Sequence, residues 1–375
     1  MKILFISSAT LLGGAELYFY KVVCELHDRG FNLQAIVNSK SKIRSRLIAN
    51  NVLVQEEHFG TSFGRARGWV GTLSLIDQIA NRRLKSLLQI KQREGYSVVV
   101  FNDPREQIIG SKIAKELGFK VIWLMHSPFH FFLNYWFGYP LLRIASSYVD
   151  HALVEANYLK DQLVNHGISE SKIKICSNFV DLHYIDSIVS PSDVFCLPKV
   201  TIGYIGRLAK GKGVEILLQA FSSVLPQIPQ IELVIAGTGP QGPHLKAISE
   251  RLNLGDKVSF VGFLENPLLL MARLDIFVNP SYDRGEVLPT NILEAFALKR
   301  IVIATEHAGI PEILSHQYNG IMIPKQDIEA LKDALLTVTS MGEQSHVLGN
   351  NARETLVGKY EKTSVIDNII YYLLN

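Results

Sequence analysis

The chain has 375 residues, more than one hydrophobic core usually supports, so we expect two domains of ordinary size. Its formal net charge of +3 is too small for a dedicated nucleic-acid-binding protein, so the expected partners are small anionic ligands and no nucleic acid. Its three cysteines are odd in number and widely spaced, which argues against a disulfide framework and against a zinc site.

A reducing compartment fits these cysteines best. The apolar run near the N-terminus, residues 3–6, is too short for a signal peptide and leads into a glycine turn. The apolar and aromatic stretch 129–148 is interrupted by polar residues, glycine and proline, so it does not predict a membrane-spanning helix. The sequence therefore predicts a cytoplasmic protein.

Short apolar runs alternate with helical patterns along most of the chain, which predicts an α/β fold with parallel sheets covered by helices on both faces. In chain order, strands are expected at 2–7, 32–37, 97–101, 120–125, 151–155, 172–176, 200–205, 232–236, 257–261, 275–279, 301–304 and 320–323. We interpret these runs as two doubly wound, Rossmann-like domains that face a cleft. Ligands of such sheets collect at the carboxyl ends of the strands.

The periodicity fades between residues 186 and 199, where serines and prolines indicate a connection between domains. We therefore expect an N-terminal domain at 1–185, a linker at 186–199 and a C-terminal domain at 200–358. The remaining residues, 359–375, are expected to form a helix that packs back on the N-terminal domain.

After the first strand, Gly13, Gly14 and Glu16 form a turn whose glycines permit close approach of a ligand to the backbone. A simple tight turn into a helix explains them as well. His126 follows the strand at 120–125, where it can hydrogen-bond a hexose hydroxyl or help position an acceptor. A structural histidine is the alternative.

The segment 65–93 carries many more basic than acidic residues among regularly spaced apolar ones. It could contact an anionic membrane surface or a phosphorylated acceptor, as could the aromatic run at 129–137. The alternative is an ordinary helix with a solvated basic face and a core face.

Two cations lie in a glycine-rich turn between the strand at 200–205 and the helical pattern at 214–225. Arg207 can bind phosphate oxygens bidentately, and Lys212 acts as a mobile point charge. The N–H groups and dipole of the helix add to this positive field, so an anion site is predicted. Two solvated surface cations are the alternative.

Glu286 and Glu294 are separated by seven residues, with a proline, Pro289, suited to the first helical position. The carboxylates can accept hydrogen bonds from hexose and ribose hydroxyls, and free N–H groups near Thr290 and Asn291 can face a diphosphate. Solvated helix-end charges are again the alternative. The pairing with two cations in the same domain favours a sugar nucleotide.

A G-x-G-x-x-G pattern at 237–242, with Gly237 and Gly239, follows a strand and also fits a dinucleotide site, for which Glu265 would be the expected acid. Pro240 in the turn and the position after the second strand of the domain argue against it. A dehydrogenase stays open as an alternative.

Taken in order and spacing, these motifs resemble family 4 of the retaining glycosyltransferases, which have the GT-B fold of two Rossmann-like domains. The resemblance covers nearly the whole chain. It rests on GGAE at 13–16, VEAN at 154–157, NFVD at 178–181, GRL at 206–208, KG at 212–213, AGTGP at 236–240, FVGF at 260–263, PS at 280–281, the two glutamates with Ala295, and AGIPE at 308–312.

The resemblance implies that Arg207 and Lys212 bind the donor diphosphate, Glu294 the ribose, Glu286 the transferred sugar and His126 a sugar hydroxyl. It also implies an acceptor-binding N-terminal domain and a donor-binding C-terminal domain. The further substrate-binding residues it suggests are Gly13, Gly14, Glu16, Gly237, Gly239, Leu288, Thr290 and Asn291.

The implied activity is transfer of a hexose-type sugar from a UDP- or GDP-sugar to a saccharide or lipid-linked acceptor in polysaccharide or lipopolysaccharide biosynthesis. No cofactor or metal is expected, and no Asp-x-Asp motif occurs. The chain departs from the family where Val287, Leu288 and Pro289 replace a glycine-aromatic-glycine run, and where Phe179 replaces a glycine. An epimerase of the same fold and a noncatalytic nucleotide-sugar-binding protein therefore stay open as alternatives.

Overall fold

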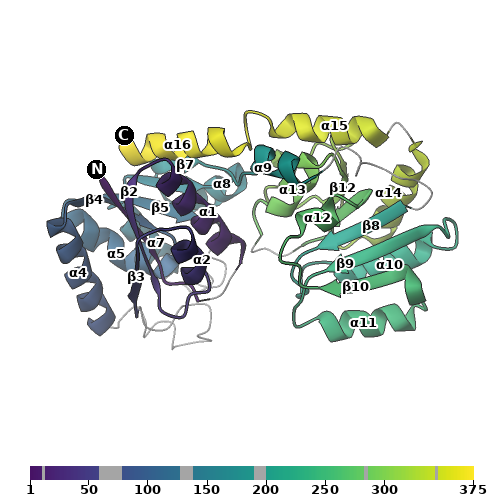
Figure 1. Cartoon of the computed structure of the whole chain (residues 1–375), viewed down its shortest axis with the longest axis horizontal. Coiled ribbons are helices and arrows are strands. Elements are labelled where there is room, and N and C mark those ends of the chain that lie inside the picture. The colour runs from purple at the N-terminus through teal and green to yellow at the C-terminus, as the bar shows by residue number, and fades with distance from the viewer. Residues whose placement is uncertain (11–12, 59–77, 127–137, 190–199, 283–285, 343–344) are drawn as a thin grey trace. The chain divides into compact units, whose positions relative to one another are not determined.

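The computed structural model describes residues 1–10, 13–58, 78–126, 138–189, 200–282, 286–342 and 345–375 (Figure 1). The chain divides into two compact units. Unit 1 consists of Met1–Ser177 and Ile366–Asn375, and unit 2 consists of Asn178–Val365.

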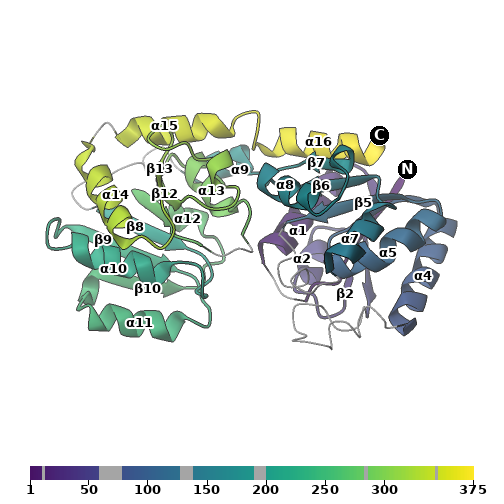
Figure 2. The same cartoon turned by 180° about the vertical axis from the view of Figure 1, so that it is seen from behind.

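Unit 1 is built on a seven-stranded parallel sheet with the order β3-β2-β1-β4-β5-β6-β7. Its strands are β1 (Lys2–Ser7), β2 (Asn32–Asn38), β3 (Val54–Glu57), β4 (Tyr96–Phe101), β5 (Lys120–Met125), β6 (His151–Val154) and β7 (Ile173–Ile175). Its helices are α1 (Gly14–Asp28), α2 (Arg44–Ala49), α4 (Gln78–Arg93), α5 (Pro104–Glu116), α7 (Gly138–Ser146) and α8 (Asn157–Asn165). Helices α4, α5 and α7 pack together in one layer, as Figures 1 and 2 both show.

Unit 2 is built on a six-stranded parallel sheet with the order β10-β9-β8-β11-β12-β13. Its strands are β8 (Val200–Ile205), β9 (Ile231–Ala236), β10 (Val258–Gly262), β11 (Ile276–Asn279), β12 (Ile301–Thr305) and β13 (Ile321–Ile323). Its helices are α9 (Leu182–Ile188), α10 (Val214–Val224), α11 (Gly242–Arg251), α12 (Leu268–Met271), α13 (Thr290–Ala297), α14 (Ile328–Ser340) and α15 (Ser345–Leu356). Helices α10, α11 and α14 form one layer, and α12, α13 and α15 form the other.

The central strands are apolar throughout because helices cover both of their faces. In β1, for example, Ile3 and Leu4 point to opposite faces of the sheet and neither is exposed to solvent. Alternate residues therefore serve two core layers, and a continuous apolar run is what the sequence of such a strand must contain.

Each sheet has one point at which the strand order reverses. It lies between β1 and β4 in unit 1 and between β8 and β11 in unit 2. Loops on the two sides of such a point diverge at the carboxyl ends of the strands and leave room for a ligand. The loop after β8 holds Arg207 and Lys212, and the loop after β11 leads to Glu286.

The predicted fold class is confirmed, and each predicted strand is present within one or two residues. One strand, β3, was missed because its sequence Val-Gln-Glu-Glu has little apolar character. As the edge strand of its sheet it is covered less than the central strands, so polar residues are tolerated there. Most of the predicted linker, residues 190–199, lies outside the described residues.

The last helix, α16 (Lys362–Leu374), begins in unit 2 and runs into unit 1, to which residues 366–375 belong. Asn368 Nδ2 donates a hydrogen bond to the Ile175 carbonyl oxygen at 3.0 Å, and Asp367 pairs with Arg29 of α1. The buried side chains Ile366, Ile369 and Leu373 recur with helical spacing and anchor this helix.

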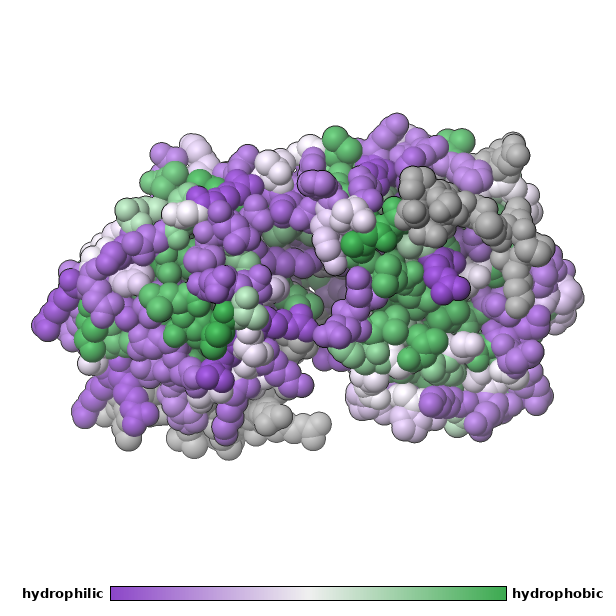
Figure 3. Space-filling model, viewed as in Figure 1, coloured by the Kyte–Doolittle hydropathy of each residue, from purple (hydrophilic) through white to green (hydrophobic). Residues whose placement is uncertain are grey.

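Hydrophobic residues gather in the middle of the visible face of unit 2, bordered by hydrophilic residues, and form smaller clusters on the visible face of unit 1 (Figure 3). None of the helices in the described parts of the chain has both the length and the apolar character that a membrane crossing needs. Within α4, Leu84, Leu87 and Leu88 are buried while Arg82 and Lys85 are exposed. The earlier part of the predicted basic segment, residues 65–77, and the aromatic run 129–137 lie outside the described residues.

Candidate functional site

The loop after β8 is held against the loop after β9 by backbone hydrogen bonds. The Leu208 N–H donates to the Thr238 carbonyl at 3.0 Å, and the Gln241 N–H donates to the Leu208 carbonyl at 2.9 Å. A Cβ on Gly237 would lie 1.8 Å from the Gly206 oxygen, and one on Gly239 would lie 2.2 Å from the Leu208 oxygen. These two glycines therefore permit the two loops to pack. Their contact with substrate stays a prediction.

Lys212 lies at the turn into α10 and is anchored by its neighbours. Gly213 adopts a φ of 71°, and a Cβ there would lie 2.0 Å from the Pro280 oxygen, so the turn requires glycine. The Tyr282 N–H donates to the Gly211 carbonyl at 2.8 Å. The turn is thus fixed against the loop that follows β11.

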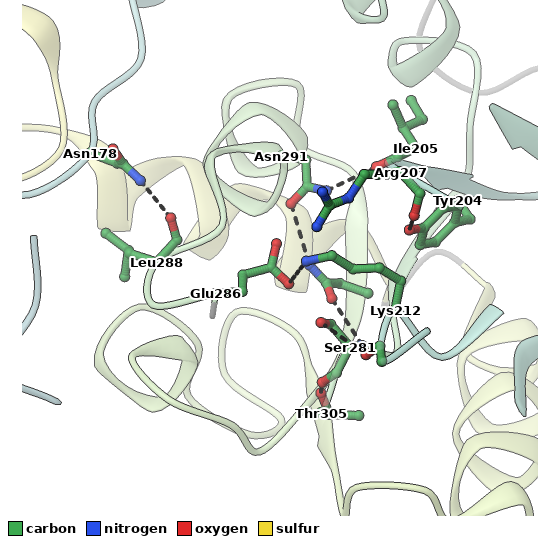
Figure 4. Close-up of polar contacts among 12 residues, drawn as sticks. Asn178, Tyr204, Ile205, Arg207, Lys212, Ser281, Glu286, Leu288, Asn291 and Thr305 are labelled. Atoms are coloured by element: carbon green, nitrogen blue, oxygen red, sulfur yellow. Dashed lines mark hydrogen bonds and ion pairs between the residues drawn. The ribbon is translucent and has the colours of Figure 1, made fainter. Parts of the chain in front are cut away.

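The side chains of Lys212 and Glu286 point toward each other across this turn (Figure 4). Lys212 Nζ lies 2.9 Å from Glu286 Oε2, and the two side chains are 13% and 22% exposed. A half-buried pair of this kind attracts more strongly than a solvated one. The structure therefore brings together a cation and a carboxylate that are 74 positions apart in the sequence.

Asn291, on the first turn of α13, links three elements of unit 2. Its Nδ2 donates to the Ile205 carbonyl at the end of β8 at 2.9 Å, and its Oδ1 accepts from Asn279 Nδ2 of β11 at 3.3 Å. The helix begins at Thr290, one position after Pro289, which is its N-cap and not its first residue as predicted. Among the described residues no side chain caps α13. The Ile292 N–H donates to the Pro289 carbonyl at 3.2 Å, so the N–H groups that could meet an anion are those of Thr290 and Asn291.

The segment that departs from the family pattern is ordered by contacts within unit 2. Asn178 Nδ2 donates to the Leu288 carbonyl at 2.5 Å, and the Gly309 N–H donates to the Val287 carbonyl at 2.9 Å. Both Val287 and Leu288 are buried, with 1% and 3% of each residue exposed. Their side chains therefore fill the core of unit 2, which explains how bulky residues replace glycine here.

The remaining predicted residues of unit 2 occupy different environments. Arg207 is exposed, and its backbone carbonyl accepts from Tyr204 Oη at 3.0 Å. Glu294 lies in α13 and is partly buried. Asn279, the last residue of β11, and Ser281, two positions beyond it, were not singled out as site residues, although polar residues at the carboxyl end of an apolar strand are the signal that could have identified them.

In unit 1, Glu16 closes the first turn of α1. Its Oε2 accepts a hydrogen bond from the Gly13 N–H at 2.8 Å. The pKa of the Glu16 carboxyl is raised mainly by burial and, to a smaller extent, by the negative charge of the nearby Asp103. The residue therefore caps its own helix. Contact of Gly13, Gly14 and Glu16 with substrate stays a prediction.

His126 lies just beyond β5, with its side chain 6% exposed. Its ring is 4.5 Å from the Tyr18 ring between centroids, and Nδ1 is 3.9 Å from Glu155 Oε2. Neither ring nitrogen has a hydrogen-bond partner among the described residues. Burial lowers the pKa of His126 to about 4, so the imidazole is neutral at pH 7 and can donate and accept one hydrogen bond each.

This pKa predicts a pH dependence of stability. Between pH 6.5 and 4 the unfolded chain binds a proton at His126 that the folded chain does not, so the free energy of unfolding falls as the pH falls. In His126→Gln we expect this decrease between pH 7 and 4.5 to be smaller by about 2 kcal/mol. Urea unfolding at both pH values measures it.

The exposed His183 provides the control, and His183→Gln should leave the pH dependence unchanged within about 0.5 kcal/mol. If the two variants lose the same amount of pH dependence, His126 is not held neutral by burial.

The described residues contain no group of three or more His, Cys, Asp or Glu side chains placed to hold a metal ion. In unit 2, the groups that we expect to bind an anion are the side chains of Arg207 and Lys212 and the N-terminus of α13.

The chain is similar to several known proteins and solved structures. The chain is 22% identical over 234 residues to an uncharacterized glycosyltransferase of Methanocaldococcus jannaschii, covering 61% of this chain and 59% of that protein. It is 27% identical over 217 residues to the N-acetylgalactosamine-N,N'-diacetylbacillosaminyl-diphospho-undecaprenol 4-alpha-N-acetylgalactosaminyltransferase of Campylobacter jejuni, covering 58% and 57%. The chain thus spans less than three fifths of each of these relatives.

Among solved structures, HepE of Anabaena in complex with UDP superposes with a TM-score of 0.83 at 19% identity, covering 100% of both chains. A glycosyltransferase of Rickettsia africae superposes with a TM-score of 0.80 at 18% identity, covering 100% and 98%. These structural similarities show that the chain has the same fold as the two proteins.

Two family models match the two halves of the chain. Glycosyltransferase Family 4 matches residues 12–184, and Glycosyl transferases group 1 matches residues 197–355. The two matches leave only the ends and residues 185–196 uncovered, and the two parallel sheets are those of the GT-B fold. The chain therefore belongs to the group 1 and family 4 glycosyltransferases of GT-B fold.

Proposed function

We propose that this protein is a retaining glycosyltransferase that moves a hexose-type sugar from a nucleoside diphosphate sugar to a saccharide or lipid-linked acceptor. The observation that carries this proposal is the 2.9 Å pair of Lys212 and Glu286 at the strand-order reversal of unit 2. A cation for the diphosphate and a carboxylate for a sugar hydroxyl are thus already adjacent.

The chemistry we propose is mainly electrostatic. As the glycosidic bond breaks, negative charge grows on the departing diphosphate, and Lys212, Arg207 and the free N–H groups at the start of α13 stabilise it. Glu286 accepts a hydrogen bond from the transferred sugar, and Glu294 accepts one from the ribose. No metal is required in this proposal. Departure and attack on the same face of the sugar retain the anomeric configuration.

The relatives guide the choice of substrates. Solved structures of HepE contain UDP and UDP-glucose, so UDP-sugars are the first donors to test, with GDP-sugars second. The Campylobacter jejuni relative is named for a diphospho-undecaprenol acceptor, which favours a lipid-linked acceptor here. With such an acceptor, we propose that the reaction belongs to polysaccharide or lipopolysaccharide biosynthesis and takes place at the cytoplasmic surface of a membrane.

The donor is testable by thermal unfolding with a panel of nucleoside diphosphates and their sugars. A ligand that binds only the folded state at one hundred times its Kd adds about 2.7 kcal/mol of stability, so we expect the Tm to rise by a few degrees. Lys212→Ala should abolish most of this shift. A protein whose Tm responds to no nucleotide would contradict the proposal.

The alternative functions give different products. An epimerase would convert the nucleotide sugar without an acceptor, and a noncatalytic protein would bind the donor but transfer sugar to no extracted acceptor. A dehydrogenase is disfavoured because Gly237 and Gly239 are required for packing of two loops, which explains the glycine pattern without a dinucleotide.

A further inference from the structure

A buried arginine of unit 1 lacks the hydrogen bonds that its burial demands. Arg105 is the second residue of α5, and its side chain is 5% exposed. Its Nε has no partner among the described residues, and Nη1 lies 3.9 Å from Glu106 Oε1, which is longer than a hydrogen bond. A buried nitrogen without an acceptor is destabilising, so the Nε of Arg105 points to a missing acceptor.

Arg105 lines a pocket between α4, α5 and the end of β3. Helices α4 and α5 lie side by side in both views (Figures 1 and 2) and contact each other. Leu84, Leu87 and Ile109 provide an apolar wall, and the exposed Arg83 is a second arginine that lines the pocket. The other lining residues are Glu57, His58, Asn81 and Glu106. Two arginines, one buried and one exposed, therefore line this pocket together with polar residues at the carboxyl edge of the sheet.

The adjacent carboxyl of Glu106 does not neutralise Arg105 at pH 7. Glu106 is 1% exposed, and its Oε2 accepts from Ser8 Oγ at 2.7 Å. Burial and the charge of Asp103 raise the pKa of Glu106 to about 8, because at 3.9 Å Arg105 opposes them only weakly. The carboxyl is then mostly protonated, which leaves two arginines, Arg83 and Arg105, and one other glutamate, Glu57, among the residues that line the pocket.

We propose that this pocket binds a phosphate group of the acceptor, with the guanidinium of Arg105 as its principal donor. The fork of an arginine matches two phosphate oxygens, and Arg83 supplies the second positive charge. The proposal rests on the proposed glycosyltransferase function and adds that the acceptor is phosphorylated. Free phosphate shares the same chemistry, so the experiment must separate the two sources.

The test is calorimetric titration of the full chain with inorganic phosphate and with glycerol phosphate. Unit 2 also has cations for phosphate, so we use an Arg207→Ala, Lys212→Ala background, in which the pocket of unit 1 is intact. Both probes should bind, and adding Arg105→Met should weaken both by about tenfold or more. The matched control is Arg82→Met, an exposed arginine of α4 that does not line the pocket, and it should leave binding unchanged.

Equal binding by the Arg105→Met and Arg82→Met proteins would overturn the proposal. Binding of inorganic phosphate without glycerol phosphate would overturn the acceptor role and identify a free-phosphate site. The Tm of Arg105→Met in phosphate-free buffer provides a second readout, because removing an unsatisfied buried cation should leave it unchanged or raise it. A clear fall in that Tm would assign Arg105 a structural role instead.

The result of the phosphate titration can be distinguished from the result of the nucleotide-binding experiment. In otherwise unaltered protein, Arg105→Met should retain the nucleotide-induced rise in Tm, because Arg105 and Lys212 belong to different units. If nucleotides bind and phosphate does not bind to the pocket, the pocket proposal fails and the proposed function stands. If no nucleotide binds, the acceptor interpretation fails even where phosphate binds to the pocket.

Discussion

Replacing Arg207 or Lys212 by alanine is expected to lower kcat/KM for glycosyl transfer by about 30- to 1000-fold, or ~2–4 kcal/mol of transition-state stabilisation. Each change removes positive charge that would meet the departing diphosphate. Lys212 should show the larger effect, because its side chain is only 13% exposed and its Nζ is held 2.9 Å from Glu286 Oε2. Initial rates at several donor concentrations, with a radiolabelled donor sugar, measure both kcat and KM.

Lys210 is the matched control, since it is exposed in the same loop and has no assigned role. Lys210→Ala should retain transfer within about threefold. Glu294→Ala should lose activity to the same order as Arg207→Ala if its carboxylate holds the ribose. Unchanged turnover in the Arg207, Lys212 and Glu294 variants together would refute the assignment of the donor site to unit 2.

Gly237→Ala is expected to lower the free energy of unfolding by about 3 kcal/mol or more. Gly237 has a φ of 129°, which side chains rarely adopt, and its new Cβ would lie 1.8 Å from the Gly206 backbone oxygen. Relief of that overlap would push apart the loops after β8 and β9 and displace Arg207. Urea unfolding and donor binding should therefore both be impaired.

Gly242→Ala, at the first residue of α11 just after the same turn, is the control, because the nearest atom to its Cβ would be Leu208 Cδ1 at 3.7 Å, an ordinary contact. It should change stability by less than about 1 kcal/mol. Equal stability of the two variants would show that the close approach of these loops is not required.

Much of the fold could be predicted because buried parallel strands have a distinctive sequence. Strands such as β1 and β8 are short apolar runs followed by glycine or polar residues, and the predicted bounds coincide with those observed. The edge strand β3 could not be identified by this rule, since its residues are only partly buried and its sequence is polar. The order of the strands within each sheet likewise could not be predicted from the sequence, because it depends on pairings between residues far apart in the chain.

The sequence by itself determined the residue types of the candidate site and their positions at strand ends, because local turns and helix starts follow from nearby glycines and prolines. Only the tertiary structure decided which of these side chains meet. The pairing of Lys212 with Glu286, the link from Asn291 to β8 and the unsatisfied Arg105 all depend on how strands separated in sequence are ordered in a sheet. Such contacts leave no local pattern, because the burial and hydrogen bonding of a side chain are set by distant neighbours.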